Sequence, residues 1–365
     1  MTEPQALGGA ARRRGKASPA GGPDTPAAEQ APAASVLAPA ELEQARNTTH
    51  VAGPLTFSTI MVLGTYFLLW GVLYTGHILT ISAAAEVTTL PWSISAAQQI
   101  IGSALALRLW MLKLRPIPRL TLTNLEIITP IAVCHTLSQV FTAIALGDDD
   151  FYYSAIFVMA TQPLFTGRFS TIFLKQAFSH SVHSALVALV IAGGAAVLVE
   201  PPEYWGTVGH AIGFSLAASM RTILAKRSMG RDMGDNMSPA NLYAAVTILS
   251  SAMFLPVWII MEGSEIEDLW EAVCDMRGGW LIWSILFSGV FFHLYNELAF
   301  RCLGLVHPLT HTVGSTFKHV CFATICFIVY DSEDISLLLL GCFLATTGML
   351  LYILVTVLEA LLSRT

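Results

Sequence analysis

The sequence predicts an all-α polytopic membrane protein with ten transmembrane helices, arranged as two inverted five-helix repeats. Three observations lead to this fold class: an apolar composition, a series of apolar segments of membrane-spanning length, and an alternation of charge between successive loops. Of the 365 residues, 54% are hydrophobic and only 12% are charged, whereas about a quarter of the residues in a typical soluble domain are charged. A lipid bilayer is therefore the expected surrounding, and no nucleic-acid partner is expected.

The N-terminal tail, residues 1–54, is predicted to be disordered. It is rich in Ala and Pro and offers no hydrophobic run with which to bury a core. A basic cluster that begins at Arg12 faintly resembles a transit peptide. Acidic residues, Glu3 and Glu43 among them, make the tail a poor example of one, and no cleaved signal peptide is expected.

Ten apolar segments follow the tail, each about 20 residues long and so able to cross the hydrocarbon layer as a helix. They are expected near residues 57–80, 91–112, 122–146, 152–173, 184–200, 207–225, 241–261, 279–300, 306–329 and 335–358. The first five would form one repeat, residues 55–200, and the last five a second repeat, residues 201–360. An odd number of spans in each repeat gives the second repeat the opposite orientation, which is the arrangement of inverted repeats.

The charges of the connecting loops support this count. Loops after even-numbered spans are basic, as in residues 108–120, which contain Arg and Lys but no acid. Loops after odd-numbered spans are acidic, as in residues 262–275, which are expected to form an exposed charged loop. The loss of one span would place basic loops on both sides of the membrane. By the positive-inside rule, the basic loops and both termini face the cytoplasm or its topological equivalent.

The polar face of the ninth span is the strongest signal for function. Lys318 and His319 lie near the middle of this apolar segment, and an ammonium group within a bilayer usually faces a cavity on a substrate path. His311, Ser315 and Lys318 follow one another at i, i+4 and i+7 and so share a helix face. The alternative is a lysine whose ammonium snorkels to the interface, which fits its central position less well.

Two prolines also point to a central site. Pro163 and Pro308 each precede a leucine in the fourth span of their repeats, and prolines at corresponding positions of two repeats often mark a binding site. Arg168 and Arg221 are further cations within spans, and each could either snorkel or line a cavity. His135 and His293 are instead expected to pack between helices.

Neither a metal site nor a cofactor is expected. The six cysteines form no CxxC pair and no zinc spacing. The histidine pairs His307/His311 and His180/His183 are too few for a di-iron site. An enzyme is not expected either, because no Ser/His/Asp or HExxH-like arrangement appears at a membrane face.

Five segments carry a resemblance to a known family. FFHLYNELAF is similar to the family's FYHLYNQVSY, and HPLTHTVGSTFKHV is similar to SPLTHSVGNTMKRV, in the same order and at the same spacing. TPIAVCHTLSQVFTAIAL is similar to LPVALAHTIGHVAATVSM, MRTILAKRSM to FRNIFSKKGM, and LPWSISAAQQIIGS to an early PYPW segment. From about Val62 to Leu354 the chain therefore resembles the triose-phosphate/phosphate translocator family. This family belongs to the drug/metabolite transporter superfamily, together with nucleotide-sugar transporters.

The resemblance implies ten helices and the antiport of phosphorylated metabolites, with a small anionic phosphorylated substrate bound near the membrane midplane. It implies substrate-binding roles for Lys318, Tyr295 and Thr142, which occupy matching family positions. Arg221 matches an arginine of a family motif and is a further candidate for substrate binding.

Three positions depart from the family pattern. Gln139 replaces a histidine of the third helix, Met159 replaces a lysine, and His319 replaces an arginine. Gln139 and His319 remain candidate substrate-binding residues. Arginine binds phosphate through a bidentate fork whereas lysine acts as a point charge, and histidine is charged only in suitable surroundings. The predicted site therefore holds fewer fixed positive charges than the family pattern.

Three functions are compatible with the sequence. The first is an antiporter that exchanges a sugar phosphate or related organic phosphate for phosphate or another phosphate ester by alternating access. The second is a nucleotide-sugar/nucleoside monophosphate antiporter of the Golgi or endoplasmic reticulum, and the third is a membrane scaffold or sensor without transport. The location is correspondingly a plastid envelope or a Golgi or endoplasmic reticulum membrane. The oligomeric state, monomer or homodimer, also stays open.

Overall fold

The computed structural model describes residues 57–147, 151–188, 205–316, 318, 343, 346–356 and 358, which all belong to one compact unit, Gln44–Thr365. Regular secondary structure within these residues is entirely helical, which confirms the all-α class. The predicted tail, most of the predicted span 184–200 and parts of the last two spans lie outside the described residues. The count of ten helices and their division into two repeats stay predictions.

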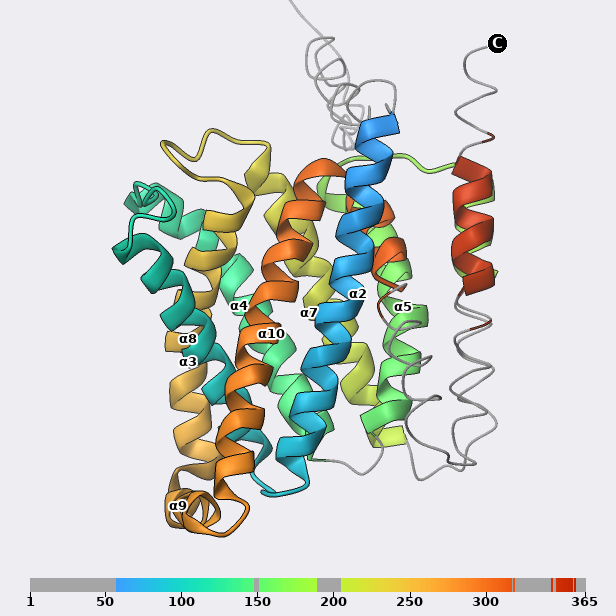
Figure 1. The fold of residues 1–365 in the computed structure, drawn as a ribbon. Helices are drawn as coiled ribbons and strands as arrows, with labels where there is room; N and C mark the ends of the chain where they lie inside the picture. The colour runs from blue at the N-terminus through green and yellow to red at the C-terminus, as the bar shows by residue number, and fades with distance from the viewer. Residues whose placement is uncertain are drawn as a thin grey trace, which may run out of the picture. The chain divides into compact units, whose positions relative to one another are not determined.

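The helices follow one another along the chain as shown in Figure 1. They are α2 (Phe57–Ala85), α3 (Pro91–Met111), α4 (Leu122–Leu146), α5 (Phe151–Phe173), α7 (Trp205–Met229), α8 (Pro239–Glu262), the 3-10 turn η2 (Gly263–Glu265), α9 (Ile266–Cys274) and α10 (Gly278–Leu305). Residues 180–188, 308–316 and 346–356 are also helical. Seven of these helices coincide with predicted spans, with ends that differ by a few residues.

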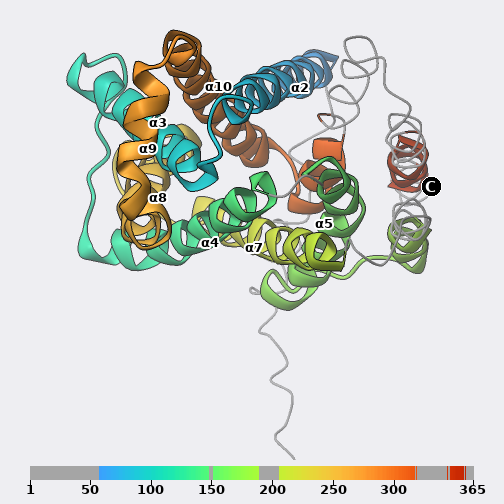
Figure 2. The ribbon, with the colours of Figure 1, turned by 90° about the horizontal axis from the view of Figure 1, so that it is seen from below.

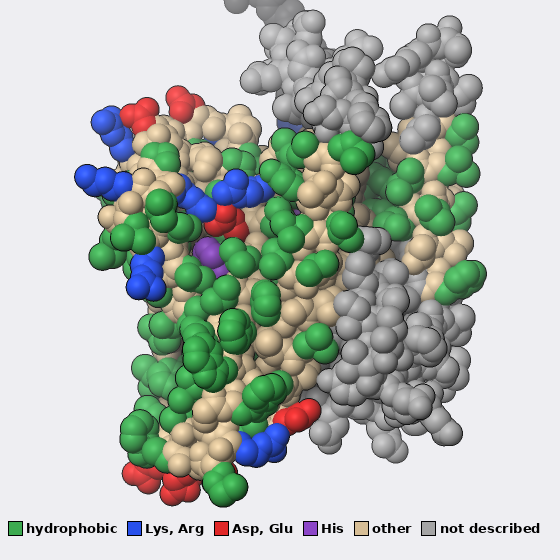
Figure 3. All heavy atoms as spheres, in the orientation of Figure 1, with side chains coloured by type: hydrophobic (Ala, Val, Ile, Leu, Met, Phe, Trp, Pro, Cys, Tyr) green, Lys and Arg blue, Asp and Glu red, His purple; other side chains and the backbone are tan. Residues whose placement is uncertain are grey.

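The described helices make the chain a multi-pass membrane protein. Five of them, as far as the described residues extend, are long and apolar enough to cross a bilayer: Met61–Ala85, Leu122–Leu146, Val208–Met229, Pro239–Cys274 and Gly278–Leu305. Figure 3 shows hydrophobic side chains over the middle of one face and charged side chains gathered toward its two ends. This distribution fits an apolar surface in contact with lipid tails and charged ends in contact with water.

Side-chain caps fix where several helices begin. The hydroxyl of Thr121 accepts a hydrogen bond from the Asn124 N–H at 3.2 Å and so caps α4. Ser238 caps α8 in the same way and is followed by Pro239 in the first turn. Both patterns satisfy backbone N–H groups that lack an intrahelical partner. Pro308 likewise starts its helix, whereas Pro163 lies inside α5, so the two prolines do not occupy equivalent helical positions.

The predicted acidic loop 262–275 is corrected by the structure, since it forms η2 and α9. Glu262 is buried, and its carboxylate accepts hydrogen bonds from the backbone N–H groups of Trp92 (2.9 Å) and Ser93 (2.6 Å). The side chain therefore caps α3 from the end of α8. A carboxylate is favourable there because helix N-termini carry unpaired N–H groups and a positive dipole end.

The packing separates two sets of helices, seen end-on in Figure 2. In one set α10 packs along α2 and against α3 and α8, and in the other α7 packs against α4 and α5. The largest core cluster of the described residues lies where the sets meet, with Ile128 and Ile131 of α4 against Tyr243 of α8 and Phe300 of α10. Aromatic and aliphatic side chains from both sets fill this contact.

A glycine sets the close approach of α10 to α3. A Cβ added at Gly289 would lie 2.8 Å from the Ile101 Cβ, whereas one added at Gly279 in the same helix would meet no atom within 4 Å. We expect Gly289→Ala to destabilise the fold by about 1–3 kcal/mol through overpacking. Gly279→Ala is the matched control and is expected to be neutral or slightly stabilising. Thermal unfolding in detergent measures both, and equal midpoints for the two variants would contradict this account.

Candidate functional site

A cavity of about 100 Å³ lies among α2, α4, α5, α7, α10 and Lys318. Its lining combines aromatic rings, amides and hydroxyls with two cationic side chains, Arg221 and Lys318. No Asp or Glu belongs to this lining among the described residues. Two positive charges in a cavity without a carboxylate favour the binding of an anion.

Lys318 points its ammonium group at aromatic rings. Its Nζ atom lies 4.6 Å from the ring centre of Tyr74, 5.3 Å from that of Trp70 and 5.8 Å from that of Tyr295. These distances are typical of cation–π contacts. No carboxylate in the described part of the chain pairs with Lys318. The aromatic faces therefore hold the ammonium in place and leave its charge uncompensated.

Arg221 is oriented by two neutral side chains. Its Nη1 atom donates to His135 Nδ1 at 2.7 Å and to Asn296 Oδ1 at 3.4 Å. Because arginine can only donate, Nδ1 of His135 is the acceptor and the imidazole proton lies on Nε2. His135 is fully buried and stacks on Phe292 at 6.0 Å between ring centres. This fixed imidazole positions the guanidinium of Arg221 at the cavity wall without neutralising it.

The cavity brings together most of the residues singled out from the sequence. Tyr295, Gln139 and Thr142 line it together with Lys318 and Arg221. Gln139 is buried, and its Oε1 atom has no hydrogen-bond partner in the described part of the chain. The Thr142 hydroxyl donates to the Ser138 carbonyl at 2.9 Å, which leaves its oxygen free to accept.

Other predicted positions lie elsewhere. Arg168 is exposed and is not part of the cavity lining. His319 lies outside the described residues, as does the side chain of Met159. Their placement relative to the cavity therefore stays a prediction.

Sequence reasoning missed the contribution of α2. Trp70, Tyr74 and His77 line the cavity from this helix, and Phe214 does so from α7. His77 is buried, with its Nδ1 atom 3.3 Å from the Ser288 carbonyl of α10. The spacing i, i+4 and i+7 places the three α2 residues on one face. That spacing is the signal that could have identified them.

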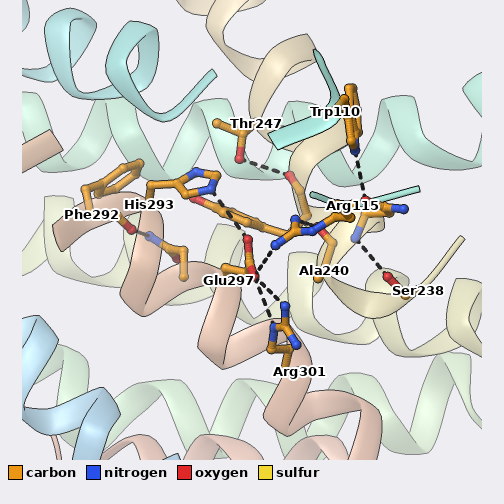
Figure 4. Close-up of polar contacts among 12 residues, drawn as sticks. Trp110, Arg115, Ser238, Ala240, Thr247, Phe292, His293, Glu297 and Arg301 are labelled. Carbon is orange, nitrogen blue, oxygen red and sulfur yellow. Dashed lines mark hydrogen bonds and ion pairs between the residues drawn. The ribbon is translucent and has the colours of Figure 1, made fainter. Parts of the chain in front are cut away.

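A second polar cluster surrounds Glu297, outside the cavity lining. Figure 4 shows the guanidinium groups of Arg115 and Arg301 converging on its carboxylate, with His293 beside it. Arg115 lies 2.6 Å and Arg301 2.8 Å from Oε1, and His293 Nε2 lies 3.5 Å from Oε2. Arg115 also donates to the Ala240 carbonyl at 3.4 Å. The cluster joins the α3–α4 loop to the start of α8 and to α10.

We expect Glu297→Ala to destabilise the fold by about 1–3 kcal/mol, because it leaves the mostly buried Arg115 without its carboxylate. Glu297→Gln keeps an acceptor oxygen and should lose less. The control is Asp235→Ala, since Asp235 pairs with Arg119 at 2.9 Å but both side chains are largely exposed, and such pairs contribute about 0–1 kcal/mol. Apparent unfolding midpoints in detergent measure all three variants, and a loss for Asp235→Ala as large as for Glu297→Ala would contradict this ranking.

Comparison with known proteins identifies relatives along most of the chain. A sequence model described as the Triose-phosphate Transporter family matches residues 61–353. Glucose-6-phosphate/phosphate translocator 1 of Arabidopsis thaliana is 26% identical over 293 residues, which cover 80% of this chain and 74% of that protein. Phosphoenolpyruvate/phosphate translocator 3 of Oryza sativa is 29% identical over 262 residues, covering 72% and 66%.

A third relative and a solved structure agree with these matches. Xylulose 5-phosphate/phosphate translocator of Arabidopsis thaliana is 27% identical over 272 residues, covering 74% of this chain and 64% of that protein. One solved crystal structure matches with a TM-score of 0.57 at 14% identity, covering 81% of this chain and 97% of its own. At that identity the structural match shows a shared fold and nothing more.

Proposed function

This chain belongs to the Triose-phosphate Transporter family, and from that premise we propose that it is an antiporter of phosphorylated metabolites. It exchanges a sugar phosphate or a related organic phosphate for phosphate or another phosphate ester. The relatives reported above are transporters named for glucose 6-phosphate, phosphoenolpyruvate and xylulose 5-phosphate, each against phosphate. These names favour small phosphate esters over nucleotide sugars and over a scaffold without transport, and no catalytic reaction is proposed.

The observation that carries the proposal is a cavity with two cations and no carboxylate in its described lining. A phosphate monoester is a dianion near neutral pH, because its second ionisation occurs near pH 6. Its charge therefore matches the combined charge of Arg221 and Lys318. Arg221 supplies a planar fork for two phosphate oxygens, and Lys318 supplies a compact point charge.

The substrate's carbon body would face the neutral side of the cavity. Gln139 and Thr142 of α4 offer an amide and a hydroxyl there, and Tyr295 of α10 offers a phenol. An unpaired buried amide oxygen is costly, so Gln139 gains a partner when a substrate hydroxyl reaches it. We propose these five residues, together with His319, as the substrate-binding set.

Compensation of the cavity's positive charge also explains why the protein would exchange one anion for another. Closing an empty cavity around two uncompensated cations is costly, because buried charges need partners. A bound anion supplies those partners and lets the carrier change the side to which it is open. The cavity then opens again to the first side only after another anion has bound. We propose that the two repeats, residues 55–200 and 201–360, move relative to each other in this step, in a ten-helix arrangement of inverted repeats.

We propose the plastid envelope as the location. The relatives reported above are chloroplastic proteins by their names. Basic loops, such as residues 108–120, place both termini on the cytoplasmic side in this proposal. A homodimer is compatible with it but is not required, because the cavity is formed within one chain.

Reconstitution tests the function directly. The purified full-length chain is inserted into liposomes preloaded with phosphate, with a nucleoside monophosphate or with no anion. Uptake of labelled triose phosphate, glucose 6-phosphate, phosphoenolpyruvate and a nucleotide sugar is then measured. The expected result is uptake of a small phosphate ester that depends on internal phosphate. Uptake driven only by the nucleoside monophosphate, or no uptake under any condition, would overturn the proposal.

A further inference from the structure

Lys226 makes an unusual contact at the end of α7. It lies in the last turn of this helix, and its Nζ atom donates to the carbonyls of Leu303 (2.8 Å), Val306 (2.8 Å) and Gly304 (3.4 Å). These are the last carbonyls of α10 and its C-cap, which have no partner within the helix. The C-terminus of a helix also carries the negative end of its dipole. One ammonium group of α7 thus caps the end of α10.

The contact joins the two sets of helices on either side of the cavity. Figure 2 shows α7 beside α4 and α5, and α10 beside α2. Arg221 lines the cavity from α7, and Lys226 lies about 7.5 Å further along the same helix axis. Ala299 lines the cavity from α10, and Leu303 lies one turn beyond it. The Lys226 contact is therefore just beyond the cavity, at the end where both helices finish.

We propose that Lys226 is a gate residue that closes this end of the cavity. Its bonds to the α10 carbonyls must break each time the cavity opens on that side, and must re-form when it closes. The proposal rests on the proposed transport function, because a gate has meaning only in a carrier. Lys226 is partly exposed, so water can replace the carbonyls when the contact opens. Such exchange makes the contact reversible, since protein and water hydrogen bonds differ little in net free energy.

The position of Lys226 also links the gate to the substrate. The same helix carries Arg221, whose guanidinium is the proposed substrate contact. A bound anion that compensates the charge of Arg221 frees α7 to move as one rigid element, and Lys226 moves with it. A simple helix cap, in contrast, would stabilise the fold without any dependence on substrate.

Labelling of the native Cys302, measured with and without phosphate, separates these two roles. Cys302 is buried, with 1% of its surface exposed, and lies in the last turn of α10 next to Leu303. A thiol reagent reaches it only when the end of α10 is uncovered. A full-length chain that keeps Cys302 and carries alanine at the five other cysteines can be placed in nanodiscs, where both membrane faces are accessible. The rate of labelling by a charged maleimide then reports opening at this end.

We expect Lys226→Met to raise the labelling rate of Cys302 by about tenfold, because a charged donor is lost from the closed state. Lys226→Arg keeps the charge and should restore slow labelling. The matched control is Arg227→Met, since Arg227 is the exposed cation next along α7 and should leave the rate unchanged. Equal rates for the parent and a monodisperse Lys226→Met chain would overturn the proposal.

A second measurement keeps the test valid if Lys226→Met does not fold. With Lys226 intact, added phosphate should raise the labelling rate of Cys302, because the bound anion permits the gate to open. A rate that is independent of phosphate, in a chain that exchanges phosphate in liposomes, would overturn the gate while leaving the proposed function in place. A chain that exchanges no phosphate ester, yet labels faster as Lys226→Met than as Arg227→Met, would overturn the proposed function and the gate together and leave Lys226 as a structural helix cap.

Discussion

Replacement of Lys318 by alanine is expected to abolish exchange in the liposome assay, with uptake reduced by roughly 100-fold or more. The ammonium lies over Trp70, Tyr74 and Tyr295, and no described carboxylate compensates its charge. Its loss removes one of the two cations in the described cavity lining. A dianionic substrate then enters a cavity that neutralises only half of its charge. Because a buried charge needs compensation, both the binding of the substrate and the closure of the cavity around it become less favourable.

The conservative variant sharpens this prediction. Lys318→Arg keeps the positive charge, but a planar guanidinium does not fill the same position among three rings as a compact ammonium does. We expect partial activity with a raised KM for the phosphate ester. Arg168→Ala is the control, because Arg168 is exposed and outside the cavity lining, and its exchange rate should match that of the unmodified chain. Strict exchange that survives in a folded Lys318→Ala chain would refute the proposed role of Lys318 in substrate binding.

The helices were predictable where apolar segments are long and bounded by charged loops. The segments that became α4 and α10 show this, since both are more than 20 residues long and have a high mean hydropathy. The region 262–275 is exposed and acidic beyond Glu262, as predicted, but it is helical rather than a loop. Its charge pattern also gives no sign that Glu262 reaches across to cap α3. Such a contact joins residues about 170 positions apart. It depends on the packing of α3 against α8, which single-sequence periodicity does not specify.

Some residues of the candidate site could likewise be predicted from the sequence, and others could not. Lys318 was found because a charge within an apolar segment is costly and therefore conspicuous. Tyr295 and Thr142 were found through family motifs. Trp70 and Tyr74 were missed, because aromatic residues in an apolar helix resemble side chains that face lipid. Only the tertiary contact of α2 with α10 turns this aromatic face toward the cavity.

Glu297 stands where the family motif has glutamine, which carries no charge. The sequence shows this replacement but gives no reason for it. Here the mostly buried carboxylate pairs with both Arg115 and the more exposed Arg301. The negative charge of Glu297 therefore stabilises the contact between α10 and the α3–α4 loop. Glu297 is not part of the cavity, whose described lining contains no acidic side chain.

Arg221 provides the second prediction with a large expected effect. Arg221→Ala should lower kcat/KM for exchange by roughly 100-fold, comparable to the truncation of other desolvated charged contacts. Arg221→Lys keeps the charge but cannot present two parallel N–H groups to phosphate, so it should raise KM more than it lowers the maximal rate. A substrate-independent loss of folding would appear in the unfolding midpoint, which is measured in parallel. Equal KM values for the lysine variant and the unmodified chain would contradict a bidentate contact.

His135 orients the guanidinium of Arg221, and a change at His135 tests this contact separately from the charge of Arg221. His135→Phe preserves the ring that stacks on Phe292 but removes the Nδ1 acceptor that lies 2.7 Å from Arg221. The guanidinium then keeps its charge and loses its orientation, so we expect an intermediate loss of about tenfold. In the Arg221→Ala background the same histidine change should have little further effect, because two residues that act through one contact are not additive. Additive losses would mean that His135 acts independently of Arg221. The guanidinium of Arg221 would then be oriented by other contacts.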